Sequence, residues 1–538
     1  MSPHPPGQGR GVPLKAVALL GLGVLAALLL VVPGTLSGFD GQSMFGVTRS
    51  IVEHWDVTVH DAVIGVPGLG GRYYSKFGPG QSLLAIPLYL IGRALEAVVP
   101  SWYRPELPGL VSSLLPALAI ACTAALLVLA AVELGAAPRG ALLLGIVYAV
   151  ATPAGVYATL WFSEPLTACA TLAAAYLLLR DRDRLTAWRP LLAGAATALA
   201  VCTRLESLLF APPLLLYAAL PRRRRPLRAA AFVLPLAVAL AGLALYNAAR
   251  FGSPLETGYS EGLGSAMRDT HPPHTLASLA EGLYGLLISP GKGLLEYAPV
   301  LLLAPLGAAM LWRRRRPELL LLLTVFALDL VAHANVLIRW VGGWSWGPRF
   351  LLPVLPLALL LLAPLLRAAL THPPLPTASV PRPQTDNAQA LKGRGRVLPG
   401  VLAALIVAGI VAQAPALVVY EPHTYIHYLQ ATVRVAGHPV DVTTLEDDYI
   451  NRPTWSPIIG SWQQLGLAGT WTAPGQVSPE LLTRQNVTVE PHTWWRLLAY
   501  QGVPTAPLAI ACALLLAMAI SCAYAAFQVG GRWQTVGG

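Results

Sequence analysis

Charged residues are scarce in this chain of 538 residues. They make up 12% of the sequence, against roughly 25% in soluble domains. Hydrophobic residues make up 55%, and apolar runs of about 20 residues, enough for a helix to cross a bilayer, recur along nearly the whole chain. The composition therefore excludes an ordinary soluble domain and predicts an all-α polytopic membrane protein.

Cysteine and acidic residues are also few. The five cysteines lie inside apolar runs with no metal-ligand spacing, which favours buried packing. Acidic residues number 26 against 37 basic ones, so the formal net charge is +11. A nucleic-acid partner would require a continuous basic face with interleaved aromatic residues. The basic residues instead form short clusters between apolar runs, at 180–189, 222–228, 313–316 and 392–396. This pattern predicts no nucleic-acid partner and places the clusters on the cytoplasmic side of a plasma (inner) membrane.

Two apolar runs cannot each be a single crossing if all these clusters are cytoplasmic. The run 190–220 lies between two clusters, so it must cross twice, and Arg204 at its midpoint is predicted to be an external break because a charge in lipid is costly. The run 78–99 begins and ends outside, which predicts a juxtamembrane helix on the outer surface. The result is a bundle of about 12 transmembrane helices with both termini cytoplasmic.

The remaining segments divide the chain into three parts. The Pro-rich stretch 371–397 is predicted to be a cytoplasmic linker. It separates a transmembrane core (1–370), which has a large external loop at 37–108, from C-terminal helices (398–538). A late polar segment, 420–503, is predicted to lie outside the membrane.

The stretch "SGFDGQSMFG" places one carboxylate, Asp40, directly after the first apolar run. If Asp40 ends the first helix, the helix macrodipole disfavours its charge, and such a carboxylate suits a general base. Alternatively, Asp followed by Gly-Gln-Ser can open the next helix as an N-cap. The residues leave both interpretations open, and one carboxylate can serve both.

Further ionisable residues gather on the predicted external side. Glu164 lies in "LWFSEP", and the cations are Lys76, Arg104, Arg204, Lys292 and Arg349. Taken singly, each cation can be an interfacial anchor or the partner of a neighbouring acid. Taken together, they predict a joint site, because ionisable groups near lipid are costly and are usually functional.

One reaction requires this set of groups at a lipid boundary. Transfer of a sugar from a lipid phosphate requires a base that takes the proton of the acceptor, and cations that hold the departing phosphate. The lipid tail can then stay in the bilayer throughout the reaction.

The motifs on this side resemble those of a known superfamily. They are "DGQSMF", "YYSKFGPGQSLLAIPLYLIG", "SEPL", "TRLE", "SPGKGLLEYAPVLLL" and "GGWSWGPRFLLPVLP". An acid after the first apolar run, a long external loop with juxtamembrane helices and a second external acid resemble the GT-C glycosyltransferases, chiefly the family-39-like bacterial enzymes. Protein O-mannosyltransferases, the lipid A aminoarabinose transferase and the oligosaccharyltransferase catalytic subunit are related examples. The likeness covers roughly residues 14–367.

The resemblance implies transfer of a hexosyl or pentosyl group, with inversion, from a polyprenyl-phosphate-linked donor to an acceptor outside the membrane. By match, Asp40 corresponds to the catalytic base and Glu164 to the second acid. Lys76, Arg104, Arg204, Lys292 and Arg349 are the candidates for binding the donor phosphate. Asp40 stands alone where many relatives have paired acids, so the sequence does not support a divalent metal cofactor. The acceptor (lipid, glycan or protein) is open.

Two other function classes remain as alternatives. A lipid-linked glycan flippase or transporter would line a path to both faces with charges deep in several helices; here Asp329 and His333 are the main such residues. A polysaccharide polymerase or ligase would use a similar donor and carry its essential residues in late external loops.

Overall fold

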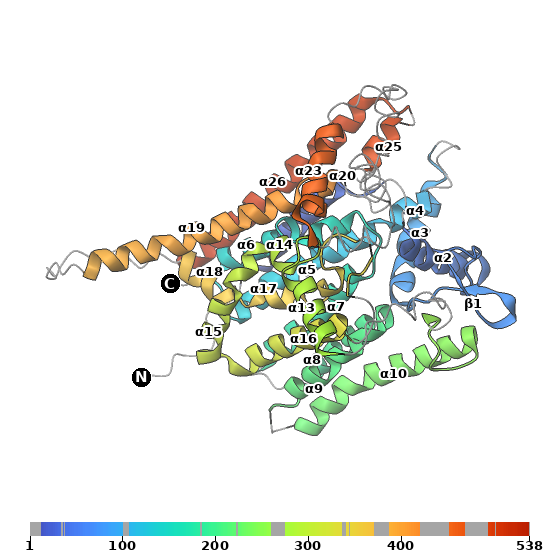
Figure 1. The fold of residues 1–538 in the computed structure, drawn as a ribbon, viewed down its shortest axis with the longest axis horizontal. Coiled ribbons are helices and arrows are strands. Elements are labelled where there is room, and N and C mark those ends of the chain that lie inside the picture. Colours follow the sequence, from blue (N-terminus) through green and yellow to red (C-terminus); the bar gives the residue numbers. More distant parts are fainter. Residues whose placement is uncertain are drawn as a thin grey trace.

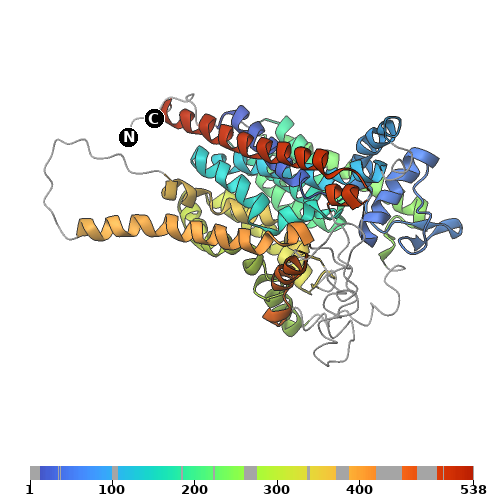
Figure 2. The same ribbon diagram turned by 90° about the horizontal axis from the view of Figure 1, so that it is seen from above.

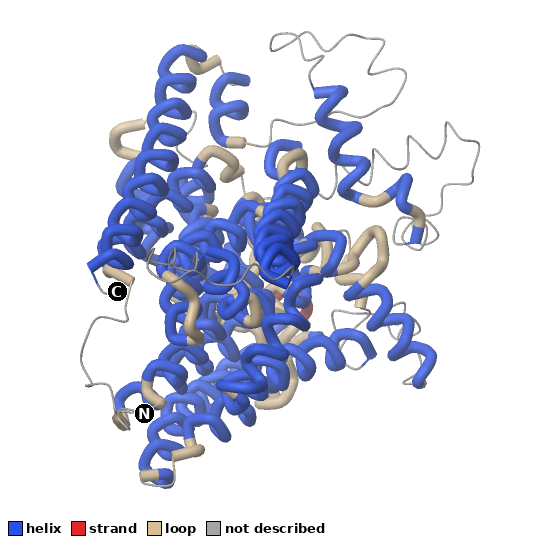
Figure 3. The backbone as a smooth tube through the Cα atoms, turned by 90° about the vertical axis from the view of Figure 1, so that its left-hand side faces the viewer, coloured by secondary structure: helices blue, strands red, loops and turns tan. Residues whose placement is uncertain are grey.

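The protein is described from a computed structural model, which is almost entirely helical (Figure 3). The structure describes residues 12–33, 36, 38–99, 107–182, 186–221, 224–259, 275–335, 340–343, 345–370, 387–419, 451–468, 493–500 and 502–536. Within these residues, five helices are long and apolar enough to cross a membrane by length and composition: Leu107–Glu133, Arg225–Phe251, Arg316–Asn335, Val397–Val418 and Thr505–Gly531. The class predicted from composition, an all-α polytopic membrane protein, is therefore confirmed.

The described elements follow the apolar runs of the sequence. The first half contains α1 (Leu14–Leu29), α2 (Phe39–His54), β1 (Val66–Pro67), η1 (Leu69–Gly71), β2 (Tyr73–Tyr74), α3 (Gly80–Leu95), α4 (Leu107–Ser112), α5 (Leu114–Glu133), α6 (Pro138–Val150), η3 (Pro153–Ala158), α7 (Glu164–Arg180), α8 (Trp188–Thr203), η4 (Leu205–Phe210), α9 (Ala211–Ala218) and α10 (Arg225–Phe251). The second half contains α13 (Leu276–Leu287), α14 (Leu294–Tyr297), η5 (Pro299–Leu303), α15 (Ala304–Arg314), α16 (Arg316–Asn335), η6 (Arg349–Leu351), α17 (Leu355–Leu360), α18 (Ala363–Leu370), α19 (Asn387–Gln413), α20 (Ala416–Val419), η7 (Pro453–Trp455), α23 (Pro457–Ala468), α25 (Trp494–Tyr500) and α26 (Thr505–Val536).

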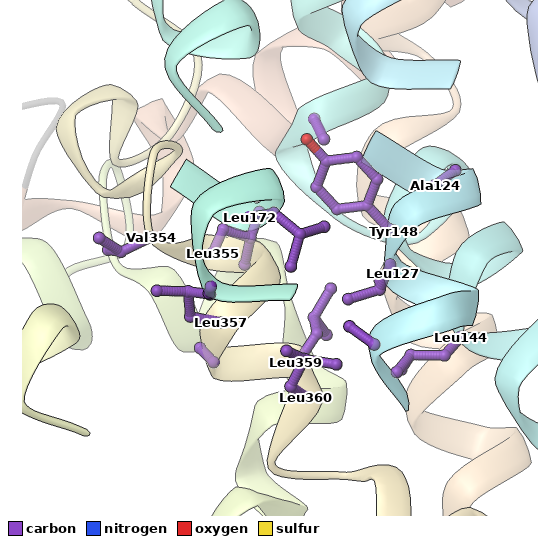
Figure 4. Packing of buried hydrophobic residues seen from close by; sticks show 14 of the residues in the cluster. Ala124, Leu127, Leu144, Tyr148, Leu172, Val354, Leu355, Leu357, Leu359 and Leu360 are labelled. Atoms are coloured by element: carbon purple, nitrogen blue, oxygen red, sulfur yellow. The ribbon is translucent and has the colours of Figure 1, made fainter. Parts of the chain in front are cut away.

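The core of the bundle is an apolar layer, mainly of leucine and alanine, between the helices (Figure 4). Leu127 of α5, Leu144 of α6 and Leu172 of α7 meet Leu359 and Leu360 there, and all five side chains are buried. Alanine and glycine let the helix backbones approach closely. At Gly194 of α8, for example, an added Cβ would lie only 2.0 Å from the Phe232 carbonyl oxygen of α10.

The elements that lead to the candidate site gather at one end of the molecule. The helices α2, α3 and α4 and the antiparallel pair β1–β2 lie there, opposite the end that carries the N and C labels (Figures 1 and 2). We call this end the hairpin end. The helix α3 begins directly on the end of α8, because a Cβ on Gly78 would lie 2.2 Å from the Cys202 carbonyl oxygen.

The predicted break in the run 190–220 is confirmed. The helix α8 ends at Thr203, Arg204 is its extended C-cap, and a 3-10 turn then leads into α9. The segment 78–99 contains the helix α3, and Arg93 near its end pairs with the C-cap residue Glu96 at 3.1 Å. Its juxtamembrane position stays a prediction.

Other expectations are revised or lie outside the described residues. The first helix ends at Leu29, and Asp40 belongs to α2. The helix α19 begins at Asn387, so its first residues fall in the segment 371–397 predicted to be a linker. Of the predicted external segment 420–503, the structure describes 451–468 and 493–500.

Buried charges at the far end of α7 serve the fold. Asp181 is fully buried and pairs with Arg228 of α10 and with Arg189. Arg228 also donates to the Ala218 carbonyl oxygen at 2.9 Å. Because each buried charge has a partner, this cluster ties α7, α9 and α10 together at the end opposite the hairpin end.

Candidate functional site

Four separate parts of the chain bring their charges together at the hairpin end. Arg349, which begins η6, contacts Asp40 of α2 through Nη1 (3.2 Å to Oδ2) and Glu164 of α7 through Nε (3.0 Å to Oε1). Arg204 contacts the same Glu164 oxygen through Nη1 at 2.6 Å and pairs with Glu206 through Nη2. These five residues form one continuous chain of ion pairs, which we call the acid–arginine cluster.

The position of Asp40 differs from the position predicted for it. Asp40 is not the end of the first helix but lies in the first turn of α2, where the macrodipole favours a negative charge. The N-cap of α2 is Gly38 (φ 83°), so Asp40 is not the N-cap either. The argument that the macrodipole of the first helix makes Asp40 a general base was therefore wrong. What the fold does show is that Asp40 lies beside a cation, Arg349.

Close packing fixes α2 against the segment that precedes α7. A Cβ on Gly41 would lie 3.2 Å from the Trp161 carbonyl oxygen, so glycine allows this approach. The Trp161 side chain in turn donates to the Ser112 carbonyl oxygen at 2.9 Å. These contacts hold the first turn of α2 beside Glu164, although the two acids are far apart in sequence.

Glu164 is the buried centre of the cluster. It is the first residue of α7, where the macrodipole stabilises a carboxylate, and its side chain is 0% exposed. Both arginines share its Oε1, while its Oε2 has no hydrogen-bond partner among the described residues. Contacting both guanidinium groups from this buried position, Glu164 acts mainly to hold them in place.

Aromatic rings support the two guanidinium groups. The Arg349 guanidinium lies 4.6 Å from the centre of the Phe162 ring and 5.1 Å from that of Phe350, and the Arg204 guanidinium lies 5.7 Å from Phe350. Such contacts attract cations while shielding them from water. Burial alone would lower the pKa of Arg349, but Glu164 and Asp40 outweigh burial and raise it, so Arg349 stays cationic.

The cluster is reached by solvent on the side of its two outer acids. The side chains of Asp40 and Glu206 are 26% and 22% exposed, whereas those of Arg349 and Arg204 are 14% and 11% exposed. An incoming molecule therefore meets two carboxylates with the arginines directly behind them.

Lys76 lies at the border of this arrangement. Its ammonium group is 5.4 Å from the centre of the Tyr259 ring and 5.5 Å from that of Phe77. The preceding residue, Ser75, accepts hydrogen bonds from the Ser43 hydroxyl of α2 (2.9 Å) and, through its carbonyl oxygen, from Arg250 of α10. Tyr259 in turn lies within electrostatic reach of Glu206, Arg204 and Asp40, so Lys76 borders the cluster through this ring.

Lys292 serves another purpose in the structure. Its buried ammonium group donates to the Gly343 carbonyl oxygen (2.8 Å) and to the carbonyl oxygen and hydroxyl of Ser345 (2.5 and 3.0 Å). These acceptors belong to the loop that leads to Arg349. Of the predicted phosphate ligands, Arg204 and Arg349 join the cluster, Lys76 borders it, Lys292 anchors its supporting loop, and Arg104 lies outside the described residues.

The donor set of the cluster does not fit a divalent metal. Each carboxylate already faces an arginine, so a cation would meet positive charge as well as negative charge. Within the described part of the chain, no group of three or more His, Cys, Asp or Glu residues could hold a metal ion.

Several residues near the cluster were not assigned to a site by sequence reasoning. Glu206 follows Arg204 by two positions in "TRLE", so its pairing was available as a short-range signal. Phe350 had no such signal, because its place depends on tertiary packing. Behind it, His333 stacks on Phe350 at 4.7 Å and pairs with Asp329 at 3.3 Å within α16.

Comparison with known proteins gives distant structural likenesses. No protein-family model and no curated protein matches the chain. The chain is similar to ArnT from Cupriavidus metallidurans, for which crystal structures exist in the apo state and bound to undecaprenyl phosphate. The sequence identity is 15%, and the TM-scores are 0.45 and 0.46, respectively. The match covers 96% of this chain and 77% of the ArnT chain. The archaeal oligosaccharyltransferase AglB from Archaeoglobus fulgidus, in complex with an inhibitory peptide and a dolichol-phosphate, is 15% identical, with a TM-score of 0.44 over 81% of this chain and 59% of the AglB chain.

Proposed function

We propose that this protein is a membrane glycosyltransferase that moves a sugar from a polyprenyl-phosphate-linked donor to an acceptor on the external face of the membrane. The observation that carries the proposal is the contact between Asp40 and Arg349. It places a partly exposed carboxylate directly beside a buried guanidinium at one end of a helical bundle. Proton removal requires a carboxylate and phosphate stabilisation requires a cation, and this contact brings one of each to the same site.

The proposed step is a single displacement at the anomeric carbon. The acceptor oxygen or nitrogen forms a bond to that carbon, the bond from the carbon to the phosphate oxygen breaks, and the configuration inverts. The Asp40 carboxylate takes the proton of the acceptor, and the electron pair of the broken bond stays on the lipid phosphate. Arg204 and Arg349 stabilise the charge that develops on that phosphate.

The buried Glu164 has a positioning role in this proposal. It contacts both arginines and is 0% exposed, so it orients the guanidinium groups and does not touch the acceptor. Lys76, at the border of the cluster, is the proposed ligand of the outer oxygens of the phosphate. Arg104 keeps its sequence-based assignment as a further phosphate candidate.

The sidedness of the site follows from the charge pattern of the chain. The Arg-rich segments at 180–189 and 313–316 lie at the opposite end of the bundle from the acid–arginine cluster in the proposed topology. The positive-inside rule then places the cluster on the outer side of the plasma (inner) membrane. The donor tail would remain among the membrane lipids while the sugar reaches the cluster.

The substitution Asp40→Asn tests the proposal, because it keeps the shape of the side chain and removes the base. We expect transfer to fall by about 10²- to 10⁴-fold, with normal amounts of protein in the membrane. The measurement is mass spectrometry of envelope glycans and lipids from cells that lack the protein, complemented with the wild type or with the variant.

Asp61→Asn is the matched control. Asp61 is exposed at the hairpin end and accepts a hydrogen bond from the Val63 amide at 2.8 Å, which an asparagine can also accept. This control should retain full activity. Full activity of Asp40→Asn would remove Asp40 from the mechanism, and movement of an intact lipid-linked glycan across the membrane without sugar transfer would favour the flippase alternative.

A further inference from the structure

The acid–arginine cluster contains more negative than positive groups. Asp40, Glu164 and Glu206 contribute three carboxylates, while Arg204 and Arg349 contribute two guanidinium groups. Both arginines are therefore already matched by acids within the protein. A phosphate that approaches this cluster must compete with a carboxylate for each arginine it contacts.

The three acids differ in how easily they can give way. Glu164 is 0% exposed and is held from a different helix, so its displacement would disturb the packing of α7. The side chain of Glu206 is 22% exposed. Glu206 follows Arg204 by two residues and lies in the 3-10 turn η4. Of the two acids that contact Arg204, Glu206 is therefore the one that solvent reaches.

The two outer acids also have different chemical consequences. Asp40 pairs with Arg349 and is the proposed base, so its loss would change both binding and the chemical step. Glu206 pairs with Arg204 and has no part in the proposed chemistry. Any effect of Glu206 on the reaction would therefore pass through the availability of Arg204.

We propose that Glu206 is a displaceable counter-ion that occupies Arg204 until the phosphate of the donor replaces it. The inference rests on the proposed function, because it assumes a lipid phosphate as ligand. In the absence of donor, Glu206 and Glu164 together neutralise the buried Arg204. With donor present, the phosphate takes over Arg204 and Glu206 turns outward. Glu206 thereby sets the affinity for the donor by competing with it.

This competition has a counter-intuitive consequence for binding. Removing the charge of Glu206 should tighten phosphate binding, because Arg204 no longer has to leave a partner. We expect the Kd of Glu206→Gln for farnesyl phosphate to fall by about three- to tenfold, which corresponds to about 0.6–1.4 kcal/mol. The affinity for farnesol, which has no phosphate, should not change.

The experiment measures equilibrium binding to the full-length protein purified in detergent, by its intrinsic tryptophan fluorescence. Farnesyl phosphate is the probe, and inorganic phosphate is used in a parallel series to separate a lipid headgroup from a free phosphate. Glu96→Gln is the matched control, since Glu96 is 20% exposed and pairs with Arg93 at 3.1 Å on α3, outside the cluster. Glu206→Ala provides a second variant with the same expected direction.

The outcomes separate this inference from the proposed function. Tighter binding of farnesyl phosphate by both Glu206 variants, with Glu96→Gln unchanged, supports the inference. Equal or weaker binding by the Glu206 variants, or equal tightening by Glu96→Gln, overturns it while leaving the proposed function intact. Tightening for inorganic phosphate but not for farnesyl phosphate also overturns it.

Two further outcomes would contradict the inference. If no variant and no wild-type protein binds farnesyl phosphate, both the competition and the proposed donor class are wrong. If neither Glu206 variant folds, Glu206 is a required part of the structure and not a displaceable counter-ion.

Discussion

Arg349 is the residue whose role in the candidate site depends most on tertiary structure. Its guanidinium joins an acid from α2 to an acid from α7, and the rings of Phe162 and Phe350 lie against it. A lysine could satisfy only one of these acids, because its ammonium is a compact point charge without the planar fork of arginine. The position of Arg349 in turn depends on the loop that precedes it.

Lys292 is the residue that anchors this loop, and its removal gives a prediction. The variant Lys292→Met keeps the length of the side chain but removes its ammonium donor. The Gly343 carbonyl oxygen keeps its bond from the Ser345 amide at 2.8 Å, whereas the carbonyl oxygen and hydroxyl of the buried Ser345 lose the bonds from Lys292. Each such loss costs about 1–3 kcal/mol. We expect a lower midpoint of thermal unfolding and a reduced rate of sugar transfer, because Arg349 loses its support.

Lys15→Met is the control for that substitution. Lys15 is exposed near the start of α1, so the same chemical change there should leave both quantities near their wild-type values. Unchanged stability and activity of Lys292→Met would show that the loop is held by its other contacts, such as the bond from the Tyr157 hydroxyl to the Trp346 carbonyl oxygen at 2.8 Å.

At the scale of elements, the contact between the start of α3 and the end of α8 positions two parts of the site. The turn at Gly78 lies between Lys76 and α3, and Arg204 follows directly after α8. The backbones touch here, since a Cβ on Gly80 would lie 2.8 Å from the Thr203 backbone nitrogen. The distance between Lys76 and Arg204 is therefore set by glycine at this contact.

The variant Gly78→Ala tests the importance of this contact. Its Cβ would overlap the Cys202 carbonyl oxygen, so α3 must move away from α8. We expect a loss of about 1–3 kcal/mol in stability and a higher KM for the donor, because Lys76 moves relative to Arg204. Thermal unfolding and donor titration measure these two effects.

Gly242→Ala gives a comparison within an apolar helix. Gly242 lies inside α10, and a Cβ there would have nothing within 4 Å. This variant should be neutral or slightly stabilising, since alanine favours helix more than glycine does. If Gly78→Ala behaved in the same way, the α3–α8 contact would have no influence on the site.

At the scale of the whole molecule, charge is separated between the two ends of the bundle. The acid–arginine cluster lies at the hairpin end, and the pairs of Asp181 with Arg228 and of Glu318 with Arg182 lie beyond the other end of α7. A helix of 17 residues is about 25 Å long, close to the thickness of the hydrocarbon layer. The two groups of charges can thus face opposite sides of one membrane.

This separation predicts the orientation of the protein. In a cysteine-free background, a membrane-impermeant maleimide added to intact cells should label a cysteine at Val63, which is 72% exposed at the hairpin end. A cysteine at Arg314, in a basic cluster, should react only after the membrane is opened. The reverse pattern of labelling would place the site on the cytoplasmic side and exclude the proposed topology.

Local properties of the chain determined the class of the protein and the order of its elements. Hydropathy and the spacing of basic clusters indicated a helical membrane protein, and the cost of a charge in lipid indicated the break at Arg204, which α8 confirms. Both inferences succeed because they depend only on residues that are neighbours in sequence. The end of the first helix was placed too late, because nothing in "SGFD" indicates which of two helices Asp40 joins.

Only the tertiary structure decided which charged groups meet. Asp40 and Arg349 are 309 positions apart, and their contact depends on the packing of α2, α7 and the loop anchored by Lys292. The sequence showed that acids and cations accumulate on one side of the membrane, because charge and hydropathy act residue by residue. It did not show that Lys292 would bind the backbone of the loop before Arg349, or that Glu206 would pair with Arg204. These contacts depend on distances that only the folded chain sets.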